Sequence, residues 1–156
     1  MIILGVDPGT ATTGYGVIET NKSKIQLIEF GCLRTPAKNR LEARLLEIYD
    51  DLKKIIKKYR PEAVAVESVF FYNNAKTAIA VAQARGVILL CAAEQKIKVL
   101  DFTPLQVKNS LTGYGKAEKK QVQYMVKTLL NLKSIPKPDD AADALALAIC
   151  AAGSRY

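Results

Sequence analysis

Short apolar runs near the amino terminus predict three strands in close succession. The first covers residues 2–7 and stops at an Asp-Pro-Gly turn, the second covers about 13–19, and the third covers about 25–33. Apolar and β-branched runs of this length, bounded by turn residues, are typical of strands. Because the connections are too short for crossovers, these strands should pair as an antiparallel meander.

The middle of the chain alternates between helical periodicity and buried strands. Apolar residues recur every three or four positions over 41–59, which predicts an amphipathic helix that ends before Pro61. A buried strand should follow at 63–67, then a mostly buried, Ala-rich helix at 75–94, and another strand at 97–101. A strand–helix–strand passage of this kind predicts a parallel crossover.

Helices should fill the last third of the chain. Thr103 and Gln106 form a capping-box pattern around a Pro at the first helical position, which predicts a short helix there. An amphipathic helix should follow over 116–130, and a final helix over about 139–152. The order predicts a single α/β domain of 156 residues. Its mixed five-stranded sheet has three antiparallel strands first and parallel crossovers after, flanked by helices.

The composition is that of a globular protein without a membrane span. Apolar residues make up 49% of the chain, and no apolar run reaches the roughly 18 residues that a span needs. The net charge of +8 suggests a polyanionic partner, although many basic proteins have none. The amino terminus lacks the basic stretch of a secretory signal. Cys32, Cys91 and Cys150 show no paired motif, which indicates core residues of a reduced, cytoplasmic protein.

Four carboxylates stand at the ends of predicted elements. Asp7 and Glu67 each end a strand, while Asp140 and Asp143 share one face at the start of the last helix. Sites in open α/β sheets gather outside the carboxyl ends of strands, so these acids should converge. Carboxylates without cationic partners usually hold a hard cation such as Mg²⁺, and two such ions can clamp a phosphodiester for hydrolysis. The absence of His supports a metal-activated water as the nucleophile.

Each acid also has a purely structural interpretation. Asp7 could start a turn, Glu67 could be a solvated strand end, and Asp140 could complement the helix dipole. Asp139 fits a helix N-cap. It is the joint placement of the acids, rather than any one of them, that favours a metal site.

Several motifs resemble those of the RuvC family of Holliday-junction resolvases, and they occur in family order from residue 3 to about 150. They are Ile3–Gly9 with Thr13–Ile18, Val66–Phe70 with Asn73-Asn74, Gln83–Gly86, Gln106–Lys108, Ala117–Lys119 and Asp140–Ala146. The resemblance implies a ribonuclease H-like fold and a homodimeric endonuclease with two Mg²⁺ or Mn²⁺ ions per active site. It also implies paired symmetric nicks in four-way DNA junctions, with 5′-phosphate and 3′-hydroxyl ends, and a RuvA–RuvB branch-migration complex as partner.

The resemblance assigns roles to particular residues by matching position. The catalytic metal ligands would be Asp7, Glu67, Asp140 and Asp143, whereas Asp139 lies outside the family's Asp-x-x-Asp register and is interpreted as a cap. Lys108 and Lys119 would contact phosphates near the scissile bond, and Phe70 would stack on an unpaired base at the junction.

Three features near these positions keep alternatives open. Lys116 lies beside the Gly113–Gly115 break and could contact phosphate, but lysine runs are usually solvated helix faces. Phe71 and Tyr72 could pack in the core or in a dimer interface. The helix at 75–94 has more apolar surface, including Ile79, Leu89 and Leu90, than one sheet face needs, so it is the candidate dimer interface.

Three other functions deserve comparison with a junction resolvase. An actin-like nucleotide-binding protein shares the Asp-Pro-Gly-Thr opening at residues 7–10, but it needs two domains, and no Walker A loop occurs here. A non-catalytic nucleic-acid-binding module explains the charge but not the four acids. A related ribonuclease H-like enzyme that trims ribosomal RNA precursors differs mainly in the aromatic loop and the lysine motifs.

Overall fold

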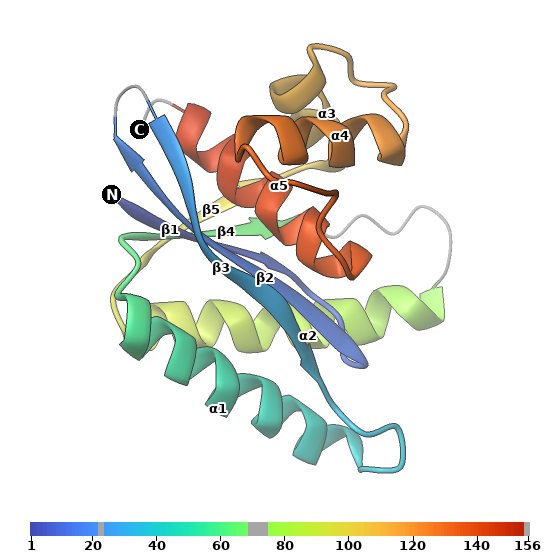
Figure 1. Ribbon diagram of the computed structural model, residues 1–156. Coiled ribbons are helices and arrows are strands. Elements are labelled where there is room, and N and C mark those ends of the chain that lie inside the picture. Colours follow the sequence, from blue (N-terminus) through green and yellow to red (C-terminus); the bar gives the residue numbers. More distant parts are fainter. Residues whose placement is uncertain (22–23, 69–74, 155–156) are drawn as a thin grey trace.

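Five strands and five helices make up the part of the chain that the computed structural model describes, residues 1–21, 24–68 and 75–154 (Figure 1). The strands are β1 (Ile2–Asp7), β2 (Thr12–Asn21), β3 (Lys24–Arg34), β4 (Ala63–Glu67) and β5 (Lys98–Phe102). The helices are α1 (Leu41–Tyr59), α2 (Ala75–Glu94), α3 (Pro104–Thr112), α4 (Lys119–Leu129) and α5 (Asp139–Gly153).

The strands form one mixed sheet in the order β3-β2-β1-β4-β5. Strands β1, β2 and β3 pair antiparallel, while β4 pairs parallel with both β1 and β5. The register places Val66 of β4 beside Val6 of β1 and Asp101 of β5. The predicted meander and parallel crossovers are therefore confirmed, and β1 and β4 end at the same edge of the sheet.

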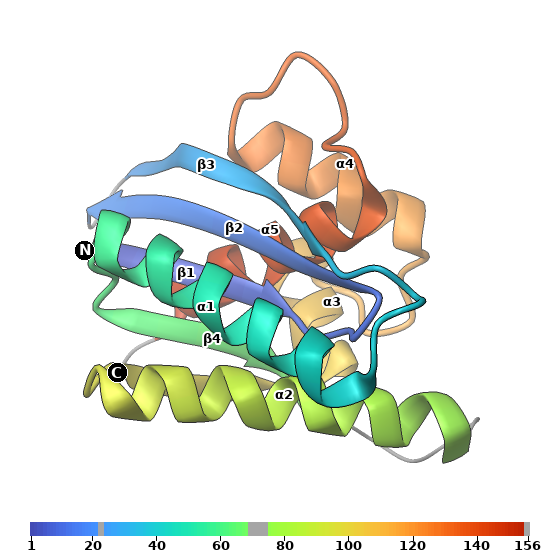
Figure 2. The ribbon, with the colours of Figure 1, turned by 90° about the horizontal axis from the view of Figure 1, so that it is seen from below.

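Helices cover both faces of the sheet, α1 and α2 on one side and α3, α4 and α5 on the other (Figures 1 and 2). Side chains alternate between these layers because successive residues of a strand point to opposite faces. Leu4 and Val6 lie in the core beneath α1 and α2, whereas Ile3 and Ala65 lie in the core on the α5 side.

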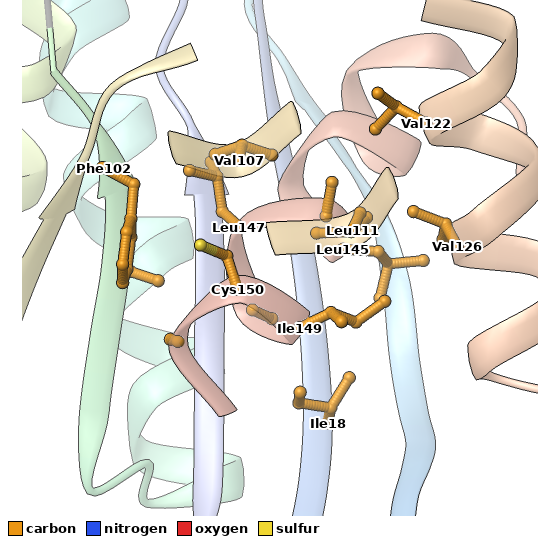
Figure 3. Close-up of a cluster of buried hydrophobic side chains, with 14 of the residues drawn as sticks. Ile18, Phe102, Val107, Leu111, Val122, Val126, Leu145, Leu147, Ile149 and Cys150 are labelled. Atoms are coloured by element: carbon orange, nitrogen blue, oxygen red, sulfur yellow. The ribbon is translucent and has the colours of Figure 1, made fainter. Parts of the chain in front are cut away.

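The core on the α5 side is built by α5, which packs on the sheet, and by α3 and α4, which pack on α5. Figure 3 shows side chains of α3, α4 and α5 meeting between the helices and the strands, with Leu145 and Ile149 of α5 near the centre. Ten residues of α5, nearly all small or aliphatic, are buried. This helix therefore lies between the sheet and the other two helices of its layer, and its first turn reaches the edge where β1 ends.

One helix start and one helix cap differ from the prediction for local reasons. Helix α4 begins at Lys119 rather than at residue 116, because Glu118 forms a capping box with Gln121. Lys116 consequently lies in an exposed turn. The N-cap of α5 is Pro138, so the interpretation of Asp139 as a cap is wrong, and Asp139 is the first helical residue.

The expectation that helix 75–94 is mostly buried is also wrong. Its inner face packs on the sheet through Ile88, Cys91 and Ala92, but Ile79 and Leu90 are 58% and 63% exposed. Cys32 is half-buried rather than a core residue. Of the helices described, none is long and apolar enough to cross a membrane.

Candidate active site

The ends of β1 and β4 place two carboxylates side by side. Val6 and Val66 are register partners, and Asp7 and Glu67 directly follow them. By strand alternation, Asp7 shares the α5 side of the sheet with Ile3, and Glu67 shares it with Ala65. Both side chains therefore enter the space between the sheet edge and α5, as the sequence predicts for parallel neighbours.

Helix α5 supplies the third carboxylate through a very close approach to the sheet. A Cβ added to Gly5 would lie 2.0 Å from the carbonyl oxygen of Ala144, and one added to Gly14 would lie 2.0 Å from that of Asp140. This close approach requires both the small residues of α5 and the glycines of the strands. The role of Gly5 and Gly14 was not predicted from the sequence, although Gly inside a strand commonly marks such a close approach.

A cleft of about 330 Å³ joins the acids to basic side chains. Asp7, Glu67 and Asp143 line it, together with Lys108 of α3 and Lys119 of α4. Apolar side chains from α3, α4 and α5 form the remaining wall. Five of the residues singled out from the sequence thus meet in one concave site, although they come from five separate elements.

Burial and the charges of neighbouring acids raise the pKa of each carboxylate in the cleft. Burial, followed by the charges of Glu67, Asp143 and Asp140, raises the pKa of Asp7 to about 8, against a smaller opposing effect of Lys119. Burial and the charge of Asp143 raise the pKa of Glu67. Burial also raises the pKa of Asp143, against the hydrogen bond that Lys119 donates to it. The cleft therefore favours any cation that enters it.

Lys119 is the cation that contacts this cluster directly. Its Nζ donates to Asp143 Oδ2 at 2.7 Å and lies 3.7 Å from Asp139 Oδ2. Asp139 also accepts from Lys137 at 3.0 Å. Asp139 therefore belongs to an exposed ion-pair network beside the cleft, rather than to the helix cap.

The donor set of the cleft fits a hard divalent cation. All of its anionic ligands are carboxylates, the group that Mg²⁺ and Mn²⁺ prefer. Burial and neighbouring acids raise the pKa values of Asp7, Glu67 and Asp143, so a cation is needed to keep these groups ionised together. Within residues 1–21, 24–68 and 75–154, no three acidic, Cys or His side chains already stand in metal-binding geometry. Lys119 occupies Asp143 Oδ2 through its hydrogen bond, and a cation bound by Asp143 would compete with that bond.

Two of the other predicted site residues, Asp140 and Lys116, do not line the cleft. Asp140 influences the pKa of Asp7 but does not line the cleft. Lys116, in the turn before α4, does not line it either. Phe70, with Phe71 and Tyr72, falls outside the described residues.

A family model described as "Crossover junction endodeoxyribonuclease RuvC" matches residues 3–151. The chain belongs to the RuvC family. The RuvC of Desulforamulus reducens is 59% identical over 150 residues, which cover 96% of this chain and 92% of that protein. The RuvC of Syntrophomonas wolfei is 54% identical over 150 residues, which cover 96% and 87% respectively. The resemblance drawn from the sequence motifs is thereby confirmed.

Solved RuvC structures share the fold over nearly the whole chain. Thermus thermophilus RuvC is 37% identical, with a TM-score of 0.89 and coverage of 96% of this chain and 92% of that chain. The same protein in complex with Holliday junction substrate gives 36% identity and a TM-score of 0.91. The predicted ribonuclease H-like α/β fold is confirmed, and RuvC membership decides against the actin-like, the non-catalytic and the RNA-trimming alternatives.

Proposed function

We propose that this protein resolves four-way DNA junctions in recombination and repair, as a metal-dependent structure-specific endodeoxyribonuclease. It makes paired symmetric nicks and leaves 5′-phosphate and 3′-hydroxyl ends. One observation carries the proposal: in a chain of the RuvC family, carboxylates from β1, β4 and α5 line a single cleft with two lysines.

Four acids hold two Mg²⁺ or Mn²⁺ ions in this proposal: Asp7, Glu67, Asp140 and Asp143. When bound, such ions supply electrophilic assistance to phosphodiester hydrolysis. The sheet fixes the backbone of Asp7 and Glu67, and a helix packed tightly on the sheet fixes that of Asp143, so only side-chain rotations are needed to bind an ion. Asp140 joins them from the preceding turn of α5, where its charge already reaches Asp7.

The basic residues bind and orient the DNA backbone. Lys108 and Lys119 flank the acids within the cleft, where an ammonium group can stabilise charge that develops on the phosphate. Lys116 is exposed in the turn between α3 and α4 and adds a phosphate contact farther out. Phe70 directly follows the β4 region and stacks on an unpaired base at the junction.

A homodimer supplies the two active sites that paired nicks require. The outward side of α2 carries exposed Ile79 and Leu90, and a side chain at Gly86 between them would meet no atom within 4 Å. An apolar stripe with a small residue at its centre suits close packing of a second copy. The RuvA–RuvB complex is the further partner that family membership suggests, and the three free cysteines together with a DNA substrate support a cytoplasmic location.

Incubation with synthetic DNA tests the activity itself. We expect nicking of a labelled four-way junction in Mg²⁺ or Mn²⁺, no nicking in excess EDTA, and recovery when the metal is restored. A linear duplex of the same sequence serves as the control and should stay intact, and the nicked products should be ligatable. Cleavage that persists in EDTA, or that is equal on linear duplex, would contradict the proposal.

Lys119→Ala should slow cleavage much more than it weakens binding. Loss of one preorganised charge near the reacting phosphate costs roughly 10²-fold in rate, whereas one phosphate contact among many changes junction affinity only a few-fold. Single-turnover rates and mobility-shift titrations separate the two effects. Lys120→Ala is the matched control, because it removes the neighbouring exposed charge outside the cleft. Equal losses of rate and affinity in Lys119→Ala would reduce Lys119 to a phosphate anchor.

A further inference from the structure

Arg85 contacts a residue of the active site from the far side of the sheet. Its Nε donates to the backbone carbonyl oxygen of Glu67 at 3.2 Å, and its Nη2 forms an ion pair with Asp101 of β5. The Arg85 side chain is only 24% exposed. This residue lies in the Gln83–Gly86 motif, to which the proposed catalytic roles give no part.

Side-chain alternation along β4 and β5 explains why Arg85 contacts the backbone of Glu67 from one side of the sheet while the Glu67 carboxylate lies on the other side. Val66 and Val99 pack in the core beneath α2, so Asp101, two residues beyond Val99, lies on the α2 side. Glu67 follows Val66 and directs its carboxylate into the cleft on the other side. Arg85 therefore holds Glu67 through its backbone, from behind, and does not enter the cleft.

The bond acts at the point where β4 ends. Glu67 is the last residue of the strand, and the amide of Ser68 donates to the carbonyl oxygen of Phe102 at 2.9 Å. Because Glu67 is the terminal residue of β4, a further bond to its carbonyl oxygen helps to fix the orientation of its peptide. A charge-assisted bond from a guanidinium supplies such support.

The chemistry of Arg suits this double contact better than that of Lys. The planar guanidinium presents donors in a fixed fork, so one group can bond Asp101 and the carbonyl of Glu67 together. Asp101 neutralises the guanidinium and fixes its plane. An ammonium would keep the charge and the ion pair but could not reproduce both directions.

We propose that Arg85, oriented by Asp101, is a positioning residue that fixes the Glu67 carboxylate in the cleft. The inference rests on the proposed role of Glu67 as a metal ligand. Groups that orient a metal ligand change metal affinity or activity by 10–100-fold when they are altered, according to the general behaviour of such sites. Displacement of a reacting group by about 1 Å has a similar cost.

The competing interpretation is a clamp that merely fastens α2 to the sheet. If Arg85 were only a clamp, loss of its side chain would lower stability, and Arg85→Lys would retain most of the wild-type stability because charge and length are kept. Positioning predicts instead that Arg85→Lys is defective at the site even where the protein is folded. The pair formed by Lys53 and Glu94 offers a matched control, since it joins α1 to α2 through an exposed ion pair far from the cleft.

The test compares Arg85→Lys, Asp101→Asn and Glu94→Gln with the wild-type protein. Mn²⁺ binding to the DNA-free protein is measured by electron paramagnetic resonance titration, with kcat, junction Kd and thermal unfolding alongside. We expect Arg85→Lys to bind Mn²⁺ about tenfold more weakly and to lower kcat between 10- and 100-fold, at a junction Kd within about twofold of wild type. Asp101→Asn should lower Mn²⁺ affinity and kcat by a smaller factor, and Glu94→Gln should leave both unchanged.

A double variant tests whether Asp101 acts through Arg85. If Asp101 acts only by orienting Arg85, then Arg85→Lys with Asp101→Asn should be no worse than Arg85→Lys alone. Wild-type Mn²⁺ affinity and kcat in a folded Arg85→Lys protein would overturn the inference and leave a structural clamp. Failure of the wild-type protein itself to bind Mn²⁺ would overturn the proposed function, and with it this inference.

Discussion

Replacing Asp7 by Asn is expected to abolish junction nicking while leaving junction binding intact. The amide matches the carboxylate in size but removes the charge that would hold a divalent cation at the end of β1. Glu67 and Asp143 are then the carboxylates that still line the cleft. Loss of several kcal/mol of transition-state stabilisation corresponds to a fall in rate of about 10³-fold or more. Single-turnover cleavage in Mg²⁺ measures the rate, and mobility shift in EDTA measures binding. Cleavage at the wild-type rate would refute the metal assignment.

Thermal unfolding measured at different pH values provides a control, because it shows whether Asp7→Asn is folded. In the folded protein, the pKa of Asp7 is raised from 3.8 to about 8, so the folded state holds this proton more tightly than the unfolded state does. Its contribution to stability is complete below pH 3.8 and is lost as the pH rises towards about 8. In chelator, Asp7→Asn should therefore unfold at a higher temperature than the wild-type protein at pH 8. If Asp7→Asn unfolded at a lower temperature than the wild-type protein at pH 8, ionisation of Asp7 would not destabilise the folded state.

Gly14→Ala is expected to cause a large loss of stability for the addition of a single methyl group. The new Cβ would stand 2.0 Å from the backbone carbonyl oxygen of Asp140, and backbone cannot move aside as a flexible side chain can. Either β2 or the first turn of α5 must shift, at a cost of about 3 kcal/mol or more, which lowers Tm by roughly 6–12 °C. The shift would also displace Asp140 and Asp143, so the nicking rate should fall as well.

Gly153→Ala is the matched control for that substitution. Gly153 ends the same helix, where an added Cβ would meet only the hydroxyl oxygen of Ser110, at 3.9 Å. Its Tm should stay the same or rise slightly, because Ala is the better helix former. Equal unfolding temperatures for the two variants would mean that α5 is not held against β2 as tightly as the structure indicates.

The fold followed largely from local sequence patterns, because most elements carry their own boundaries. Three strands separated by turn residues and a helix with an unbroken apolar stripe were predicted close to their observed limits. The error at the start of α4 arose because Glu118 is a less familiar N-cap than Ser or Thr, so its capping box with Gln121 was not recognised. For α2, an apolar composition was interpreted as burial, whereas only one side of the helix packs on the sheet.

Five of the residues singled out from the sequence line the cleft, whereas Asp140 and Lys116 do not, and the contacts within the cleft could only be predicted in part. Asp7 and Glu67 could be paired from the sequence because parallel neighbouring strands end at the same edge. The bond of Lys119 to Asp143 could not, because it joins side chains from two helices whose relative placement no local pattern specifies. The same holds for Arg85, whose partner is a backbone oxygen across the sheet.

The sequence by itself determined the order of strands and helices, the family, and which acidic residues stand at the ends of β1, β4 and α5. These features depend on periodicity, turn residues and motifs, all of which lie within short stretches of chain. Only the tertiary structure decided how close α5 lies to the sheet, which cations face the acids, and how Glu67 is held from behind. Those properties depend on distances between groups far apart in the chain, and such distances are set by the packing of backbone against backbone at Gly5 and Gly14.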